Sequence, residues 1–202
     1  MSMKLWKKAL LALSFGTMIW SGVFPKDYFT WFLEVLPVMI GLPVLLYFES
    51  KKKVSSLMFF IVTVHCVVLS IGGHYTYAEV PLGYWLQDIF GFSRNHYDRI
   101  GHFMQGVTPA LLCLEIFTRK RVMARSFWLG LCSVAIALSF SAFYELIEWW
   151  AAVLTGEAAD AFLGTQGDIW DTQWDMFLAL CGALTTNLIL FKTSFLEKLS
   201  NS

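Results

Sequence analysis

Acidic and histidine side chains recur at helical spacing inside apolar segments of this 202-residue sequence. Asp98, His102 and Gln105 are spaced i, i+4 and i+7, so a helix would place them on one face. Glu145 and Glu148, spaced i and i+3, would share a face in a later segment. Acids and histidines on aligned faces at a membrane boundary normally face the protein interior rather than lipid. The two stripes therefore indicate a polar cluster inside a helix bundle.

A third group of acids precedes and enters the last apolar segment. Asp168, Asp171 and Asp175 share one face if that helix begins by Asp168, and negative charge is favourable at a helix N-terminus. A simpler interpretation is that Asp168 caps the helix and Asp171 only complements its dipole. Carboxylates held close together need a metal ion, cationic partners or shared protons. Arg94 and Arg99 are too few to neutralise all of them.

A divalent cation is the first chemistry that this pattern favours, because carboxylates and imidazole are its usual protein ligands. Such an ion could activate water or hold a phosphate-bearing substrate. The predicted metal ligands are Asp98, His102, Glu145, Glu148, Asp171 and Asp175. Asp98 and His102 are also the predicted catalytic acid/base pair, and Gln105, Arg99, Gln166 and Asp168 are predicted to bind substrate.

Two other functions stay open. Carboxylates that share protons would suit a small proton- or cation-coupled transporter, although only His65 is expected near the midplane, with Glu115 and Asn187 deeper toward the inner side. The polar faces could instead hold together a non-catalytic envelope subunit. In that case Asp98→Asn would cost stability and nothing else.

The composition indicates that the helices carrying these residues cross a membrane. Of all residues 57% are hydrophobic and only 15% are charged, against about 25% charged in soluble domains. Six apolar segments approach the ~20 residues that a membrane-spanning helix needs. They lie near residues 9–24, 28–48, 54–72, 100–117, 126–154 and 174–191. We expect an all-α transmembrane bundle of six helices forming a single domain over residues 1–202.

The charges give the expected orientation. Twelve of the fifteen Lys and Arg residues fall on one side of the six segments, which predicts that both termini are cytoplasmic. Eleven of the fifteen acids fall on the other side: ten lie in or beside the outer loops 73–99 and 155–171, and Asp27 lies in the turn between the first two segments. The chain is neutral overall and has no basic patch suited to nucleic acid. The expected surroundings are the lipid bilayer and a lipid or envelope-precursor headgroup.

The first outer loop contains a pattern of its own. Leu82, Trp85, Leu86, Ile89 and Phe90 recur at i, i+3, i+4, i+7 and i+8, which predicts an amphipathic helix. The segment starts with a proline at 81, suited to a first helical turn, and is followed by a glycine at 91, suited to a stop. We expect a short helix lying in the membrane interface.

Four motifs carry a resemblance to a known family. They are Gly73-His-Tyr-Thr-Tyr-Ala-Glu-Val-Pro81, the run from Arg94 to Gly106, Tyr144-Glu-Leu-Ile-Glu-Trp149, and the run from Gly164 to Asp175. Together they resemble the YjdF-like bacterial inner-membrane proteins over roughly residues 25–192. More distantly, the Asp98/His102 and Asp175/Gly182 pairs are similar to motifs of VanZ-like envelope proteins, although Ala179 replaces the polar residue expected between the latter. The resemblance implies location in the bacterial cytoplasmic membrane and a multi-pass architecture.

Overall fold

The structure, a computed structural model, describes residues 3–156, 163 and 165–200. Within these residues every regular element is helical and no strand occurs. The chain forms two compact units. Unit 1 comprises residues 1–101 and 147–169, and unit 2 comprises residues 102–146 and 170–202. The expectation of an all-α protein is confirmed for the described residues.

Among the described residues, five helices are long and apolar enough to cross a membrane, where the sequence predicts six. The five are α2 (Tyr28–Ser50), α3 (Ser56–Tyr75), α5 (Tyr97–Arg119), α6 (Phe127–Thr155) and α8 (Asp171–Phe191). Helix α1 (Leu5–Ser21) has 17 residues, so it is about 26 Å long at ~1.5 Å per residue. That length falls slightly short of a ~30 Å hydrocarbon core.

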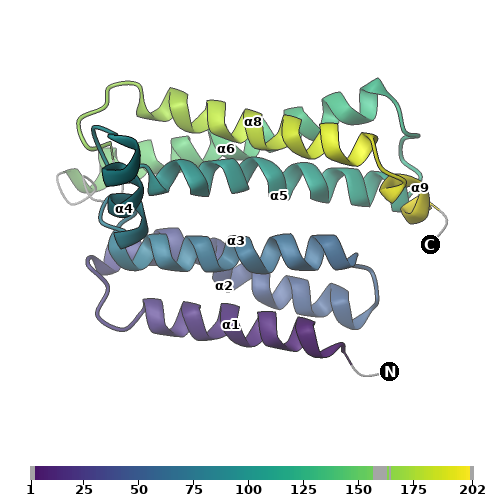
Figure 1. Cartoon of the computed structure of the whole chain (residues 1–202), viewed down its shortest axis with the longest axis horizontal. Coiled ribbons are helices and arrows are strands. Elements are labelled where there is room, and N and C mark those ends of the chain that lie inside the picture. The colour runs from purple at the N-terminus through teal and green to yellow at the C-terminus, as the bar shows by residue number, and fades with distance from the viewer. Residues whose placement is uncertain (1–2, 157–162, 164, 201–202) are drawn as a thin grey trace. The chain divides into compact units, whose positions relative to one another are not determined.

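In unit 1, helix α3 packs against both α1 and α2 (Figure 1). The core between them is apolar and includes Leu42 and Phe59, both fully buried. Polar side chains inside this core bond to backbone, as where the Ser14 hydroxyl donates to Thr63 O at 3.1 Å. Because a hydroxyl in lipid cannot bond to water, such bonds remove the cost of burying it. They also tie α1 to α3.

The expected short helix in the first outer loop is present as α4 (Pro81–Phe90), and its place in the membrane interface stays a prediction. Pro81 is its first residue, and Gly91 ends it in a left-handed conformation with φ of +65°. The large side chains of Trp85 and Phe90 are about 60% exposed, while Gly83 is buried. A Cβ atom at Gly83 would overlap the Asn95 side chain, so one face of α4 packs on the protein. The apolar face on the other side suits a membrane interface.

In unit 2, α5, α6 and α8 lie side by side (Figure 1), and the short helix α9 (Phe195–Ser200) follows α8. Gly106 of α5 faces the backbone of Ala179 on α8, and Gly182 of α8 faces the backbone of Phe103 on α5. A Cβ at either glycine would overlap that backbone. Small residues that let helices approach this closely are the usual basis of helix association in membranes.

Two details of the sequence prediction are corrected. Helix α5 begins at Tyr97, three residues before the predicted segment, and so includes Asp98. Helix α8 begins at Asp171, with Trp170 in the capping position. Asp168 therefore neither lies on α8 nor caps it, and it follows a turn in which Gln166 and Gly167 have positive φ angles of +49° and +84°. The second outer loop lies partly outside the described residues.

Candidate functional site

The centre of the candidate site is His102, which is 6% exposed in unit 2. Its two ring nitrogens approach carboxylates from different helices. Nδ1 lies 3.8 Å from Glu145 Oε1 on α6, and Nε2 lies 3.9 Å from Asp175 Oδ2 on α8. Both carboxylates are buried, with side-chain exposures of 7% and 4%. The fold thus brings together one predicted residue from each of the three acidic stripes.

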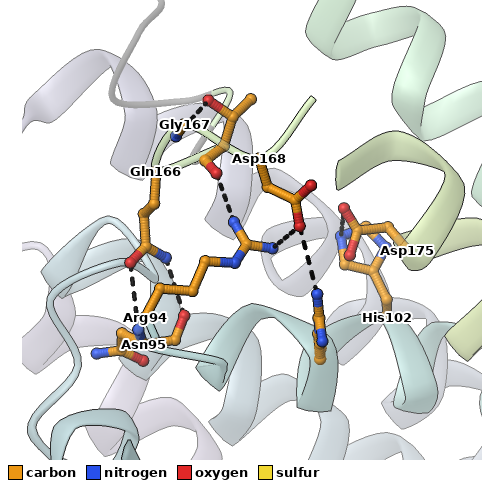
Figure 2. Close-up of polar contacts among 9 residues, drawn as sticks. Arg94, Asn95, His102, Gln166, Gly167, Asp168 and Asp175 are labelled. Carbon is orange, nitrogen blue, oxygen red and sulfur yellow. Dashed lines mark hydrogen bonds and ion pairs between the residues drawn. The ribbon is translucent and has the colours of Figure 1, made fainter. Parts of the chain in front are cut away.

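Gln105 determines which ring nitrogen of His102 carries the proton in the neutral imidazole. Its Oε1 lies 2.9 Å from His102 Nδ1, three residues earlier on the same face of α5. Because an amide oxygen only accepts, Nδ1 must donate this hydrogen bond. In the neutral imidazole, Nε2 then carries the lone pair and faces Asp175. Gln105, predicted from sequence to bind substrate, therefore contacts the histidine and orients it (Figure 2 shows His102 beside Asp175).

Close helix packing positions this cluster. Gly106 and Gly182 bring α5 and α8 together within four residues of His102 and seven residues of Asp175 respectively. Larger residues at these glycines would separate the helices, and the histidine and the aspartate would move apart. The small residues of α5 and α8 are thus part of the geometry of the site.

The remaining predicted ligands lie on the same helices. Asp171 is buried one turn before Asp175 on α8, so the two aspartates share a face. Asp98 lies four residues before His102 on α5, and Glu148 lies three residues after Glu145 on α6. Their participation in the cluster stays a prediction from helix geometry.

The donor set of unit 2 fits a divalent cation. Two ligands of one tetrahedral ion, each about 2.0–2.2 Å from it, lie about 3.4 Å apart. The 3.9 Å between His102 Nε2 and Asp175 Oδ2 is close to that spacing. A histidine ligand whose other nitrogen donates to an oxygen is the usual arrangement at metal sites, and here Gln105 Oε1 accepts that hydrogen bond from His102 Nδ1. Imidazole with carboxylates favours zinc or manganese over calcium.

Asp168 belongs to a different cluster, in unit 1. Its Oδ2 lies 3.6 Å from Arg94 Nη2 and 3.5 Å from Arg99 Nη2 (Figure 2). Arg94 also donates to the carbonyl oxygen of Thr165. The three charged side chains are between 10% and 24% exposed, so solvent screens them only in part. The two guanidiniums therefore balance a carboxylate that the sequence assigned to substrate.

Gln166 completes this second cluster. Its side-chain amide pairs with the backbone of Asn95, because Gln166 Nε2 donates to Asn95 O at 2.9 Å and Asn95 N donates to Gln166 Oε1 at 3.3 Å (Figure 2). Together with the Asp168 ion pairs, these bonds tie residues 165–168 to residues 94–99. We call this set of contacts the arginine clasp. A substrate role for Arg99, Gln166 and Asp168 stays a prediction.

Asn95 is a key residue that the sequence analysis did not single out. It is 1% exposed, and its Nδ2 donates to Val80 O at 3.0 Å, next to the start of α4. Its Oδ1 accepts from Tyr97 N at 3.0 Å, at the start of α5. An asparagine two residues before a helix is a local signal for such a turn, and it could have been noticed.

His96, beside the clasp, has a pKa lowered from its usual value, first by burial and then by the positive charges of Arg99 and Arg94. Asp168 and Asp98 oppose that shift. The clasp environment thus favours the neutral imidazole. The sequence analysis had assigned no role to this histidine.

Comparisons with known proteins agree with the helical architecture. Residues 7–194 match the family described as "Predicted membrane protein (DUF2238)". The chain is 46% identical over 173 residues to the "Inner membrane protein YjdF" of Escherichia coli (strain K12), which covers 86% of this chain and 83% of that protein. No solved structure matches. The resemblance to YjdF-like proteins is therefore confirmed.

Proposed function

This chain belongs to the DUF2238 family of membrane proteins, and on that premise we propose that its His102 cluster binds a divalent cation beside a lipid or cell-envelope headgroup. The chain is a multi-pass protein of the bacterial inner membrane. Its charge distribution supports six spanning segments with both termini in the cytoplasm, which puts the start of α5 and of α8 at the outer side.

One observation carries the proposal: a buried histidine lies between two buried carboxylates from two other helices. Negative charges in a membrane protein are costly unless a positive charge accompanies them. In the described part of unit 2, Glu145 and Asp175 approach one imidazole, and Asp171 lies one turn before Asp175 on the same face of α8. A divalent cation would add positive charge beside these carboxylates.

The roles follow from the geometry. His102 Nε2 and Asp175 would bind the ion, Gln105 would hold the imidazole, and Glu145 would stabilise positive charge on the ring from the Nδ1 side. Asp171 of unit 2 is the proposed additional ligand, while the roles of Asp98 and Glu148 stay predictions from sequence. A bound cation would supply a Lewis acid for a phosphate oxygen of the headgroup.

Metal content of the detergent-purified full chain tests the ion. After supplementation with Mg, Mn, Zn and Ca, elemental analysis should find about one ion per chain, and Asp175→Asn and Glu145→Gln should lose it. Asp88→Asn, which changes an exposed acid on α4, is the matched control and should retain the ion. Wild-type protein without an ion, or Asp175→Asn with a full complement, would contradict the proposal.

The headgroup is tested separately. A labelled polyprenyl phosphate should bind the wild-type protein in nanodiscs, and EDTA should release it together with the ion. If EDTA left the polyprenyl phosphate bound, the headgroup would not bind at this cluster, and the proposal of a metal ion would be unaffected.

Proton-coupled transport is the second candidate. An imidazole that faces one carboxylate on each nitrogen can pass a proton between them, and the Asn187–Ser133 hydrogen bond of 2.7 Å adds polar groups between α6 and α8. If no ion is found, His102→Gln should abolish proton flux into proteoliposomes. If the proton flux persisted in His102→Gln, transport through the cluster would be excluded, and the cluster would have a structural role.

A further inference from the structure

Unit 1 contains a cavity of about 360 Å³ at the end where α1 begins, α2 ends and α3 begins. Since α2 and α3 qualify as membrane-spanning helices, the turn between Ser50 and Ser56 lies at a membrane boundary. The cavity is lined by Met3, Lys4, Lys7, Leu46, Glu49, Ser50, Lys52 and Ser56. None of these residues belongs to the His102 cluster.

The charge of the cavity is positive. Three lysines and one glutamate line it, which leaves two positive charges in excess. Lys7 is already engaged, because its Nζ lies 2.6 Å from Glu49 Oε1 and 4.7 Å from the centre of the Phe59 ring. Lys4 and Lys52 are exposed at the rim, and they supply the excess.

Two further features favour a phosphate that is attached to an apolar body. Helix α3 begins at Ser56, which lines the cavity, so the positive end of the helix dipole lies at this end of the cavity, while Met58 N is already capped by Ser55 Oγ. Met3 and Leu46 provide apolar wall beside the charges. Free phosphate would gain nothing from that wall, whereas a lipid would cover it.

We propose that this cavity binds the phosphate of an anionic phospholipid headgroup at the membrane surface. Lys4 and Lys52 contact the phosphate, the start of α3 donates to it, and the Lys7–Glu49 pair holds the base of the cavity. Basic pockets between membrane helices bind anionic headgroups in this way. The proposal does not depend on the metal site, since it uses different residues and needs no cation.

The test is native mass spectrometry of the full chain with phosphatidylglycerol, with phosphatidylcholine and with inorganic phosphate as probes. Phosphatidylglycerol should bind in preference to phosphatidylcholine, and Lys4→Gln/Lys52→Gln should weaken it roughly tenfold. Both lysines are exposed, so this variant should fold normally, which thermal unfolding checks.

The matched control is Lys8→Gln/Lys53→Gln. It removes the same charge from α1 and from the same turn, at exposed residues that do not line the cavity. Its affinity should fall about threefold or less, because such charges act only through the screened surface potential. Equal losses in both variants would overturn the proposal, and so would binding of inorganic phosphate with no preference for the lipid. EDTA should leave this binding unchanged, which separates it from the headgroup binding proposed at His102.

Discussion

The His102 cluster and the arginine clasp both contain buried or half-buried aspartates, but they balance charge differently. In the clasp, one carboxylate faces two guanidiniums at 3.5 and 3.6 Å. In the His102 cluster, two carboxylates face one imidazole at 3.8 and 3.9 Å. The clasp carboxylate therefore has two permanently charged partners, whereas the carboxylates of the His102 cluster approach an imidazole, which is positively charged only when it is protonated.

This difference indicates which of the two can recruit a ligand. A carboxylate that arginines already neutralise gains little from a cation and serves to fix backbone segments. Buried carboxylates that approach an imidazole gain from a metal ion or a proton. Sequence spacing alone grouped Asp168 with Asp171 and Asp175. In the structure Asp168 belongs to the arginine clasp, whereas Asp171 and Asp175 lie on α8.

Gly106→Ala should have the largest effect, because it would break the geometry of the His102 cluster without touching the clasp. The added Cβ would overlap the backbone of Ala179, and backbone cannot turn aside. We expect a loss of about 3 kcal/mol in unfolding free energy measured in detergent. Gly16→Ala, where nothing lies within 4 Å, is the control and should be neutral or slightly stabilising. Equal stability of the two variants would show that α5 and α8 do not pack closely.

Cation binding should distinguish the two regions directly. At a cation concentration of about 100 times its dissociation constant, the wild-type protein should gain about 2.7 kcal/mol of stability. Asp175→Asn should lose this gain, and Asp168→Asn should keep it, since its carboxylate faces arginines. Thermal unfolding with and without the cation measures both. If Asp168→Asn also lost the stability gained from the cation, the arginine clasp and the His102 cluster would not differ in cation binding.

Asp168→Ala should cost about 1–2 kcal/mol, because it leaves Arg94 and Arg99 without the carboxylate between them. Asp88→Ala removes an exposed acid and should stay within about 0.5 kcal/mol of the wild type. Limited proteolysis around residues 165–168 should speed up only in Asp168→Ala. No change in either measurement would mean that the clasp contributes nothing to stability.

The smallest expected effect is a pH dependence of the clasp. The lowered pKa of His96 means that the unfolded chain binds a proton more readily than the folded chain. Stability should therefore fall as pH drops through about 6.5, the ordinary value, toward the lower folded value. His96→Gln should flatten this part of the stability profile, whereas His74→Gln should not. A wild-type profile that is flat between pH 7 and 5 would contradict the shift.

Local signals explain the parts of the fold that the sequence predicted well. Pro81 and Gly91 bound α4 because proline suits a first turn and glycine accepts the left-handed conformation at a helix end. Residues of a single stripe, such as His102 and Gln105, were predictable because helical periodicity fixes their shared face. The turn before α8 was not predictable from spacing, because Gln166 adopts a positive φ there and pairs with the backbone of Asn95, 71 residues earlier.

The sequence by itself determined that the chain is a helical membrane protein and which residues share each helical face. Composition and periodicity suffice for this, since a bilayer accepts only elements that satisfy their own backbone hydrogen bonds. Only the tertiary structure decided that Glu145 and Asp175 approach opposite nitrogens of His102, and that Asp168 lies between two arginines. Such pairings depend on how closely helices pack at glycines such as Gly106 and Gly182, and that distance is not encoded in the spacing of any one segment.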